Sequence, residues 1–209
     1  MLYGPYVPAI STDRDAATEE MRQAVLNTVR SLLIERGWSR TTISDVAIAA
    51  GVTRQEIYEE FGTRQGLAEA YVVRDVMRMI TVLEAGIREN QGNPLVAIQN
   101  AIEVFLKLAS DEPVIQIIVA GVDEGGLLGL LTSLGRAIAA ERLTLVMEEV
   151  WPRVRDVDMR LFADTIVRLA ISHAVIPTGA AREVAEGVAR LLHPFLLQIL
   201  GRPVAVDND

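Results

Sequence analysis

The chain has 209 residues, half of them hydrophobic, with a net charge of −8, two histidines and no cysteine. The lack of cysteine excludes disulfides, thiolate nucleophiles and cysteine-bound metal ions, and it agrees with a cytoplasmic protein. Because no apolar run approaches the roughly 20 residues of a membrane-spanning helix and the first residues lack a secretion signal, we expect neither membrane insertion nor export. The high hydrophobic content predicts apolar surface for an oligomer interface or an internal cavity.

The sequence pattern of the first part of the chain changes at Thr18, where helical periodicity begins. Residues 1–17 contain two prolines and no helical periodicity, so we expect a flexible arm there. Thr18 can cap a helix whose first turn holds Glu19 and Glu20, and apolar side chains then recur on one face as far as Gly37. This pattern predicts an amphipathic helix of about five turns.

Two short helices follow, separated by a tight turn. Thr42 can cap the first, which ends at Gly51, where a positive φ is favoured. Thr53 can cap the second, which runs from Arg54 to about Phe61. Two short helices joined by a turn that contains glycine form a helix-turn-helix, whose second helix enters the major groove of DNA.

The remainder of the chain is also predicted to be helical. A long helix should run from Thr63 to about Glu89, and further helices are expected at about 94–109, 112–122, 127–150, 158–176 and 181–200. No segment has a partner with which to form a sheet. We therefore predict an all-α fold of about nine helices, with a helix-turn-helix head over 18–63, a helical body over 64–200 and a disordered tail over 201–209.

A set of residues at fixed spacing runs through the predicted head: Thr41-Thr42, Val46-Ala47, Ala50-Gly51-Val52, Ile57-Tyr58, Phe61, Thr63, Arg64 and Leu67. As a set it resembles the helix-turn-helix of the tetracycline-repressor (TetR) family of bacterial transcriptional regulators. The resemblance implies a homodimer that binds a palindromic operator, and a body that holds a small-molecule effector and forms the dimer. Most members repress transcription, so a repressor is expected.

The resemblance also implies which side chains face DNA: Thr42, Ser44, Thr53, Arg54, Gln55, Tyr58 and Arg64. Hydroxyls and helix N-termini suit phosphate oxygens, and Arg64 is expected at a phosphate. Arg54 and Gln55 suit bidentate contacts to guanine or adenine, so we place sequence specificity on these two residues.

The charge of the predicted head is unfavourable for DNA binding. The first ninety residues hold 10 Arg and 13 Asp or Glu, so a basic face must arise from placement rather than from excess charge. Glu56, Glu59 and Glu60 depart from the family's pattern in the recognition helix. Either Glu56 or Glu60 accepts a hydrogen bond from cytosine, or these carboxylates turn away from the DNA and the affinity for DNA is modest.

The family normally encloses a ligand cavity between its fourth and eighth helices. The candidate lining residues are almost all aliphatic: Met77, Ile80, Ile102, Phe105, Ile118, Leu134, Phe162 and Ile166. This chemistry favours a hydrophobic effector, lipid-like or fatty-acyl, although ordinary core packing is the alternative for each residue. The last two helices are more apolar than one protein face requires, which predicts that they pair with a second subunit in a four-helix bundle.

Catalysis and metal binding lack a candidate site. His173 and His193 lie on predicted helices without a second ligand at metal-binding spacing, and no nucleophile is paired with a base. We therefore expect no enzymatic activity, no metal and no cofactor. The alternative to an effector-responsive repressor is a helical lipid-binding protein without DNA binding, which the acidic recognition helix suggests.

Overall fold

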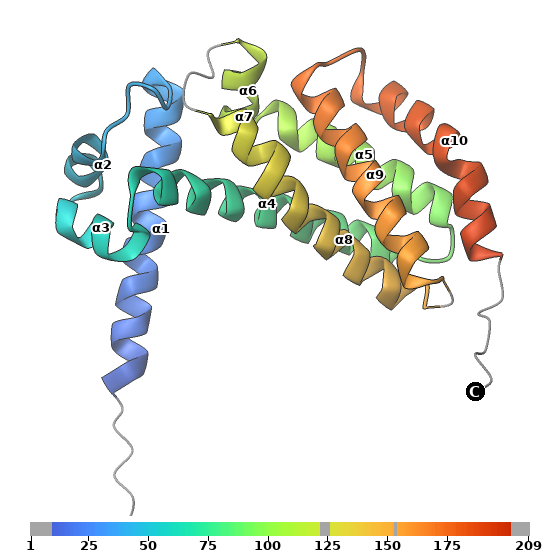
Figure 1. Cartoon of the computed structure of the whole chain (residues 1–209), viewed down its shortest axis with the longest axis horizontal. Helices are drawn as coiled ribbons and strands as arrows, with labels where there is room; N and C mark the ends of the chain where they lie inside the picture. The colour runs from blue at the N-terminus through green and yellow to red at the C-terminus, as the bar shows by residue number, and fades with distance from the viewer. Residues whose placement is uncertain (1–9, 122–125, 153, 202–209) are drawn as a thin grey trace, which may run out of the picture. The chain divides into compact units, whose positions relative to one another are not determined.

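A computed structural model describes residues 10–121, 126–152 and 154–201 (Figure 1). These residues form helices and no strand, which confirms the predicted all-α fold. Counting the continuous run 127–150 as one helix, the described chain has nine. The chain divides into two compact units, Met1–Tyr71 and Val72–Asp209, and the division falls within the long helix α4 (Arg64–Glu89) rather than at its start.

Unit 1 contains α1 (Ile10–Arg36), α2 (Ile43–Ala50), α3 (Arg54–Phe61) and the start of α4. Helix α1 begins at Ile10, so residues 10–17 are helical, and the prediction that they belong to a flexible arm is wrong. Residues 15–20 are exposed, and a helix that buries no face leaves no apolar periodicity in its sequence. The rest of the predicted arm lies outside the described residues.

The core of unit 1 explains why these short helices form where they do. Its side chains are almost completely buried and come from all four helices: Val25, Leu26, Val29, Leu33, Val46, Ile57, Leu67 and Tyr71. Gly51 ends α2 with φ 69°, and Gly62 ends α3 with φ 70°. Both values lie in the left-handed region that glycine adopts without strain, as the sequence predicts for Gly51.

Unit 2 contains the rest of α4, then α5 (Pro94–Ser110), α6 (Pro113–Val119), α7 (Leu127–Leu130), the π-helical stretch η1 (Leu131–Gly135), α8 (Arg136–Val150), α9 (Asp156–Val175) and α10 (Ala181–Leu200). Helix α8 lies beside α9, and α5 lies beside α10 (Figure 1). The predicted bounds are met within a few residues except at α6, which ends at Val119. The predicted tail after Gly201 lies outside the described residues.

The π-helical stretch interrupts what the sequence predicts as one helix over 127–150. Within it, the hydroxyls of Thr132 and Ser133 donate to the carbonyls of Leu128 and Gly129, at 2.7 Å and 2.6 Å. Such stretches are rare and occur often at functional sites. No helix of the described residues is long and apolar enough to cross a membrane.

Candidate nucleic-acid interface and internal cavity

Each short helix of the helix-turn-helix begins with a capping box, as the threonine positions predict. At α2, the Thr42 hydroxyl accepts from the Asp45 N–H at 3.2 Å, and the Asp45 carboxylate accepts from the Thr42 N–H at 2.9 Å. At α3, Thr53 and Glu56 repeat the arrangement at 3.1 Å and 2.7 Å. These hydrogen bonds satisfy backbone N–H groups that a helix start leaves unpaired.

The capping boxes also hold two carboxyl groups in their charged form. Hydrogen bonds from the Thr42 side chain and backbone lower the pKa of Asp45 below its ordinary value. Hydrogen bonds from the Thr53 backbone and side chain lower the pKa of Glu56 in the same way. Glu56 therefore turns back to the first turn of its own helix, where the helix dipole favours negative charge.

The other two acidic residues of α3 also have protein partners. Glu59 accepts a hydrogen bond from the Gln55 amide at 2.7 Å. Glu60 forms an ion pair with Arg22 of α1, and the Arg22 guanidinium lies 5.2 Å from the centre of the Phe61 ring. Of the two alternatives that the sequence leaves open, this arrangement favours the one in which Glu56 and Glu60 turn away from the DNA.

The exposed side of α3 carries the residues expected to read DNA. Arg54 and Gln55 are exposed, and Tyr58 exposes 43% of its surface. In the part of the chain that the structure describes, no carboxylate pairs with Arg54. Helix α2 packs against α3, and its cap Thr42 is exposed while Ser44 is half-buried. An unpaired guanidinium beside an amide and a phenol is suited to base edges and phosphates.

Arg64 occupies a different environment from the one expected of a phosphate contact. Its Nε donates to the Thr41 carbonyl at 3.0 Å, and its terminal nitrogen donates to the Trp38 carbonyl. Its guanidinium also stacks 4.3 Å from the centre of the Trp38 ring, which is 3% exposed. Arg64 therefore links the start of α4 to the loop between α1 and α2. The predicted phosphate contact stays a prediction.

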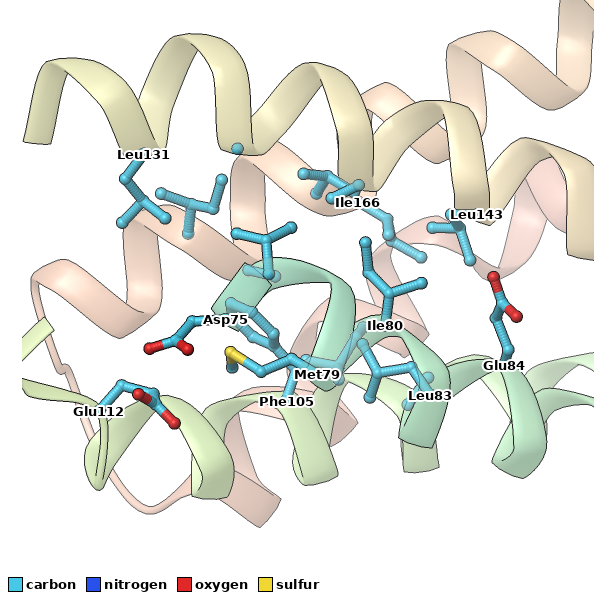
Figure 2. A pocket seen from close by; sticks show the side chains of 18 of the residues that line it. Asp75, Met79, Ile80, Leu83, Glu84, Phe105, Glu112, Leu131, Leu143 and Ile166 are labelled. Atoms are coloured by element: carbon cyan, nitrogen blue, oxygen red, sulfur yellow. The ribbon is translucent and has the colours of Figure 1, made fainter. Parts of the chain in front are cut away.

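Unit 2 contains a cavity of about 100 Å³ between α4, α5, α6, η1, α8 and α9 (Figure 2). Four of the eight predicted lining residues face it: Ile80, Ile102, Phe105 and Ile166. The other four, Met77, Ile118, Leu134 and Phe162, do not line it. On α4 the lining positions run through 72, 76, 80 and 83, so Met77 falls on another side of the helix. Phe162 instead stacks on Phe195, with ring centres 6.1 Å apart.

Three buried carboxylates that the sequence analysis missed also line the cavity: Asp75, Glu84 and Glu112. Each is only 7% exposed. Figure 2 shows Asp75 and Glu112 at one end of the cavity and Glu84 at the other. Asp75 and Glu84 fall within the apolar stripe of α4, and acidic residues at such positions are the feature that identifies them from sequence.

Arginines hold all three carboxylates. Arg74 lies 3.1 Å from Asp75, and Arg78 pairs with Glu112. Glu84 forms ion pairs with Arg142 and Arg88, with N···O distances of 2.7 Å and 3.5 Å. Since a buried charge is costly unless it is paired, these arginines allow carboxylates to face an apolar cavity.

Apolar side chains remain exposed on the two last helices. Leu161 and Val157 of α9 and Leu191 and Leu197 of α10 each expose more than half of their surface, with Leu191 at 70%.

Among the described residues, no group of three or more His, Asp or Glu side chains could hold a metal ion. The Nδ1 atom of His173 lies 3.2 Å from the Thr178 hydroxyl.

Comparison with known proteins covers both units. A sequence profile described as bacterial regulatory proteins of the tetR family matches residues 25–71, and one described as the C-terminal domain of the bacterial tetracycline repressor matches residues 94–194. The chain is 36% identical over 184 residues to the HTH-type transcriptional regulator AlkX of Mycobacterium tuberculosis, and the aligned region covers 87% of each protein. It is 30% identical over 98 residues to the HTH-type transcriptional repressor BepR of Brucella suis, and the aligned region covers 46% of this chain and 47% of that protein.

Two solved structures resemble this chain in fold. The TetR family repressor AlkX of a Dietzia species, implicated in the biodegradation of n-alkanes, is 34% identical, with a TM-score of 0.72 over 84% of this chain and 97% of that one. A transcriptional regulator of Pectobacterium atrosepticum is 22% identical and shares the fold, with a TM-score of 0.63 over 90% of this chain and 98% of that one.

Proposed function

Because the chain belongs to the TetR family of bacterial helix-turn-helix transcriptional regulators, we propose that it is a repressor which a hydrophobic small molecule releases from a palindromic operator. The observation that carries the DNA-binding part is the charge arrangement of α3. The carboxylates of Glu56, Glu59 and Glu60 are engaged within the protein, and the guanidinium of Arg54 is available. The negative charge of the head therefore does not prevent contact with phosphates.

The proposed operator contacts come from α2 and α3. Arg54 makes bidentate hydrogen bonds to a base edge, and Tyr58 donates its hydroxyl to a phosphate. The Gln55 amide donates one of its two N–H groups to Glu59 in the free protein, and its second N–H and its carbonyl can contact a base edge. Specificity then rests on Arg54 and Gln55.

The proposed dimer uses α9 and α10. Their exposed leucines pair with the same residues of a second subunit in an isologous four-helix bundle. A two-fold dimer of this kind places two heads on successive major grooves, about 34 Å apart or a multiple of it, which requires a palindromic operator.

The proposed effector occupies the cavity of unit 2. Apart from the three carboxylates its lining is apolar, which suits an aliphatic compound. The relative from Dietzia is implicated in n-alkane biodegradation, and this supports the same class of chemistry. Helix α4 begins at Arg64 in unit 1 and lines the cavity from Val72 onward, so a ligand that shifts α4 changes the spacing of the heads. A difference of a few kcal/mol in ligand affinity between two spacings is sufficient.

The test is a titration of a fluorescent duplex taken from the DNA just upstream of the protein's own gene, at 50 and 200 mM salt. We expect affinity to fall steeply with salt, since phosphate contacts release counterions. Arg54→Ala should weaken specific binding about 10- to 100-fold, and Tyr58→Phe several-fold. Lys107→Ala is the matched control, because Lys107 is exposed on α5 and its loss changes the net charge equally.

The competing function is a helical lipid-binding protein without DNA binding. It predicts no salt-dependent affinity for the upstream duplex or for a duplex of random sequence, while apolar ligands still bind the cavity. That result would replace the repressor with the lipid-binding protein. Binding to both duplexes with equal affinity would instead leave a DNA-binding protein whose operator lies elsewhere.

A further inference from the structure

We infer that the effector of the unit 2 cavity is a hydrocarbon without a polar head group, rather than a fatty acid or an alcohol. This inference rests on the proposed function, since it takes the cavity as the effector site, and it narrows the lipid-like class that the sequence predicts. The observation that carries it is the surface of the cavity, which is almost wholly apolar although three acidic residues belong to its lining.

The three acidic residues contribute carbon rather than oxygen to this surface. Asp75, Glu84 and Glu112 are each 7% exposed, and each carboxylate is paired with arginine. Both oxygens of Glu84 are engaged, one by Arg142 and the other by Arg88. Because the cavity surface contains almost no polar atom, the carboxylate oxygens are turned from the surface that a ligand touches.

The rest of the wall is apolar in its buried and its less buried parts alike. Apart from the acidic residues, the described lining consists of aliphatic side chains, Phe105, Met79 and Gly135. The half-buried lining residues belong to this set, for example Leu83 of α4 and Ala139 of α8. A hydrocarbon chain therefore gains hydrophobic stabilisation along its whole length.

An anionic head group would compete with ion pairs that already exist. The arginines beside the cavity and their carboxylates balance in charge: Arg74 with Asp75, Arg78 with Glu112, Arg142 with Glu84, and Arg88 with Glu84 and Glu149. A fatty-acid carboxylate would have to displace one of these partners or lie desolvated near like charges. Both arrangements are costly, so the site disfavours a fatty acid.

A hydroxyl head group has a smaller cost of the same kind. The hydroxyl loses its hydrogen bonds to water when it enters, and the apolar wall supplies almost nothing in exchange. Burial of a hydroxyl without a partner should weaken binding by roughly 10- to 100-fold relative to the hydrocarbon of the same chain length. A hydrocarbon leaves no polar group unsatisfied, and it is therefore the class of ligand that this wall favours.

The experiment compares three compounds with the same number of carbon atoms, n-heptane, 1-heptanol and heptanoate, on the full chain at pH 7.5. Headspace gas chromatography measures binding of the two volatile compounds, and isothermal titration calorimetry measures heptanoate. We expect n-heptane to bind about 10- to 100-fold more tightly than 1-heptanol, and heptanoate to bind more weakly than either. Equal affinities of n-heptane and 1-heptanol would mean that the hydroxyl keeps a partner or its water, and would overturn the inference. Heptanoate binding as tight as that of n-heptane would overturn it too.

A variant that fills the cavity shows whether the compounds bind there. Ala139 lines the cavity, whereas Ala137 of the same helix is exposed and does not. Ala139→Phe should weaken n-heptane binding about ten-fold or more, because the ring occupies the space of the ligand, and Ala137→Phe is the matched control that should leave it unchanged. Unchanged binding by a folded Ala139→Phe protein would place n-heptane elsewhere and overturn the inference. If circular dichroism shows that Ala139→Phe does not fold, Ala139→Leu takes its place.

Duplex release separates this inference from the proposed function. A preference for n-heptane without release of the operator duplex supports the ligand class and contradicts the proposed repressor mechanism. Release by heptanoate alone supports the mechanism and overturns the ligand class. Absence of binding by all three compounds overturns the cavity as the effector site, and the inference with it.

Discussion

Replacing Arg64 by alanine separates a structural role from a role in DNA binding. The guanidinium donates to the carbonyls of Thr41 and Trp38 and stacks on the Trp38 ring. Hydrogen bonds from a charged donor contribute about 1.5–3 kcal/mol each, and a stacked cation at a partly exposed site adds about 0.5–1 kcal/mol. Arg64 is half-buried, and after its loss the Trp38 carbonyl would still accept a hydrogen bond from the Thr41 N–H, at 3.0 Å. The lower ends of these free-energy ranges therefore apply.

We therefore expect Arg64→Ala to destabilise the head by about 3.5 kcal/mol. In a chain of this length 1 kcal/mol shifts the melting temperature by roughly 2–4 °C, so the loss should be roughly 7–14 °C by circular dichroism. Arg64→Lys should retain little of the stability, since an ammonium cannot reach two carbonyls with a planar fork. Arg40→Ala is the matched control, because Arg40 is exposed in the same loop and carries the same charge.

The alternative is that Arg64 acts on DNA. It predicts an unchanged melting temperature for Arg64→Ala, weaker duplex binding, and a salt dependence reduced by about one phosphate contact. Arg64→Lys would then keep most of the affinity. Duplex binding should be measured at 10 °C, well below the melting transition, so that unfolding does not contribute. This combination of results would refute the structural reasoning.

Three further predictions concern the head and the dimer. A Cβ at Gly66 would lie 2.2 Å from the Phe61 carbonyl oxygen, whereas a Cβ at Gly86 would meet nothing within 4 Å. Gly66→Ala should therefore lower the free energy of unfolding in urea by more than about 2 kcal/mol, and Gly86→Ala should leave it unchanged or raise it. Equal effects of the two substitutions would contradict this. The lowered pKa of Glu56 means that its capping box stabilises the head above the unfolded-state pKa near 4.5 and that this stability is lost as pH falls through the folded-state value. Glu56→Gln should therefore destabilise the head at pH 7, and the difference should shrink as pH falls below about 4.5; a pH-independent difference would argue against it. Leu191→Glu should convert the proposed dimer to a monomer by light scattering, and an unchanged mass would exclude α10 from the interface.

The helix-turn-helix could be predicted from sequence because its determinants are local. Thr42 and Thr53 satisfy N–H groups three residues away, and Gly51 ends a helix through its own φ. Such interactions require no knowledge of the tertiary structure. The start of α1 could not be found in this way, since residues 15–20 are exposed and the sequence before Thr18 shows no helical periodicity.

The cavity was less accessible to sequence reasoning because its lining depends on helix rotation. Ile80 and Met77 are both apolar residues of α4, but only Ile80 faces the cavity. The role of Arg64 likewise depends on a contact 23 residues away along the chain, with the Thr41 carbonyl. Asp75 is an acidic residue within the apolar stripe of α4, and this position is the sequence signal for the site. The signal can be interpreted only once it is known that this stripe faces a cavity.

The π-helical stretch has a consequence for insertions and deletions in this chain. Deletion of one residue between Leu131 and Gly135 would replace the π-helical turn by an ordinary α-helical turn, because the wider turn holds one additional residue. Each residue of a π turn rotates the chain less than a residue of an α turn, so α8 would keep its orientation relative to α7, and Ala139 and Leu143 would stay at the cavity wall. Related chains that lack this additional residue should therefore line the same wall with the corresponding α8 side chains, shifted by one position relative to α7.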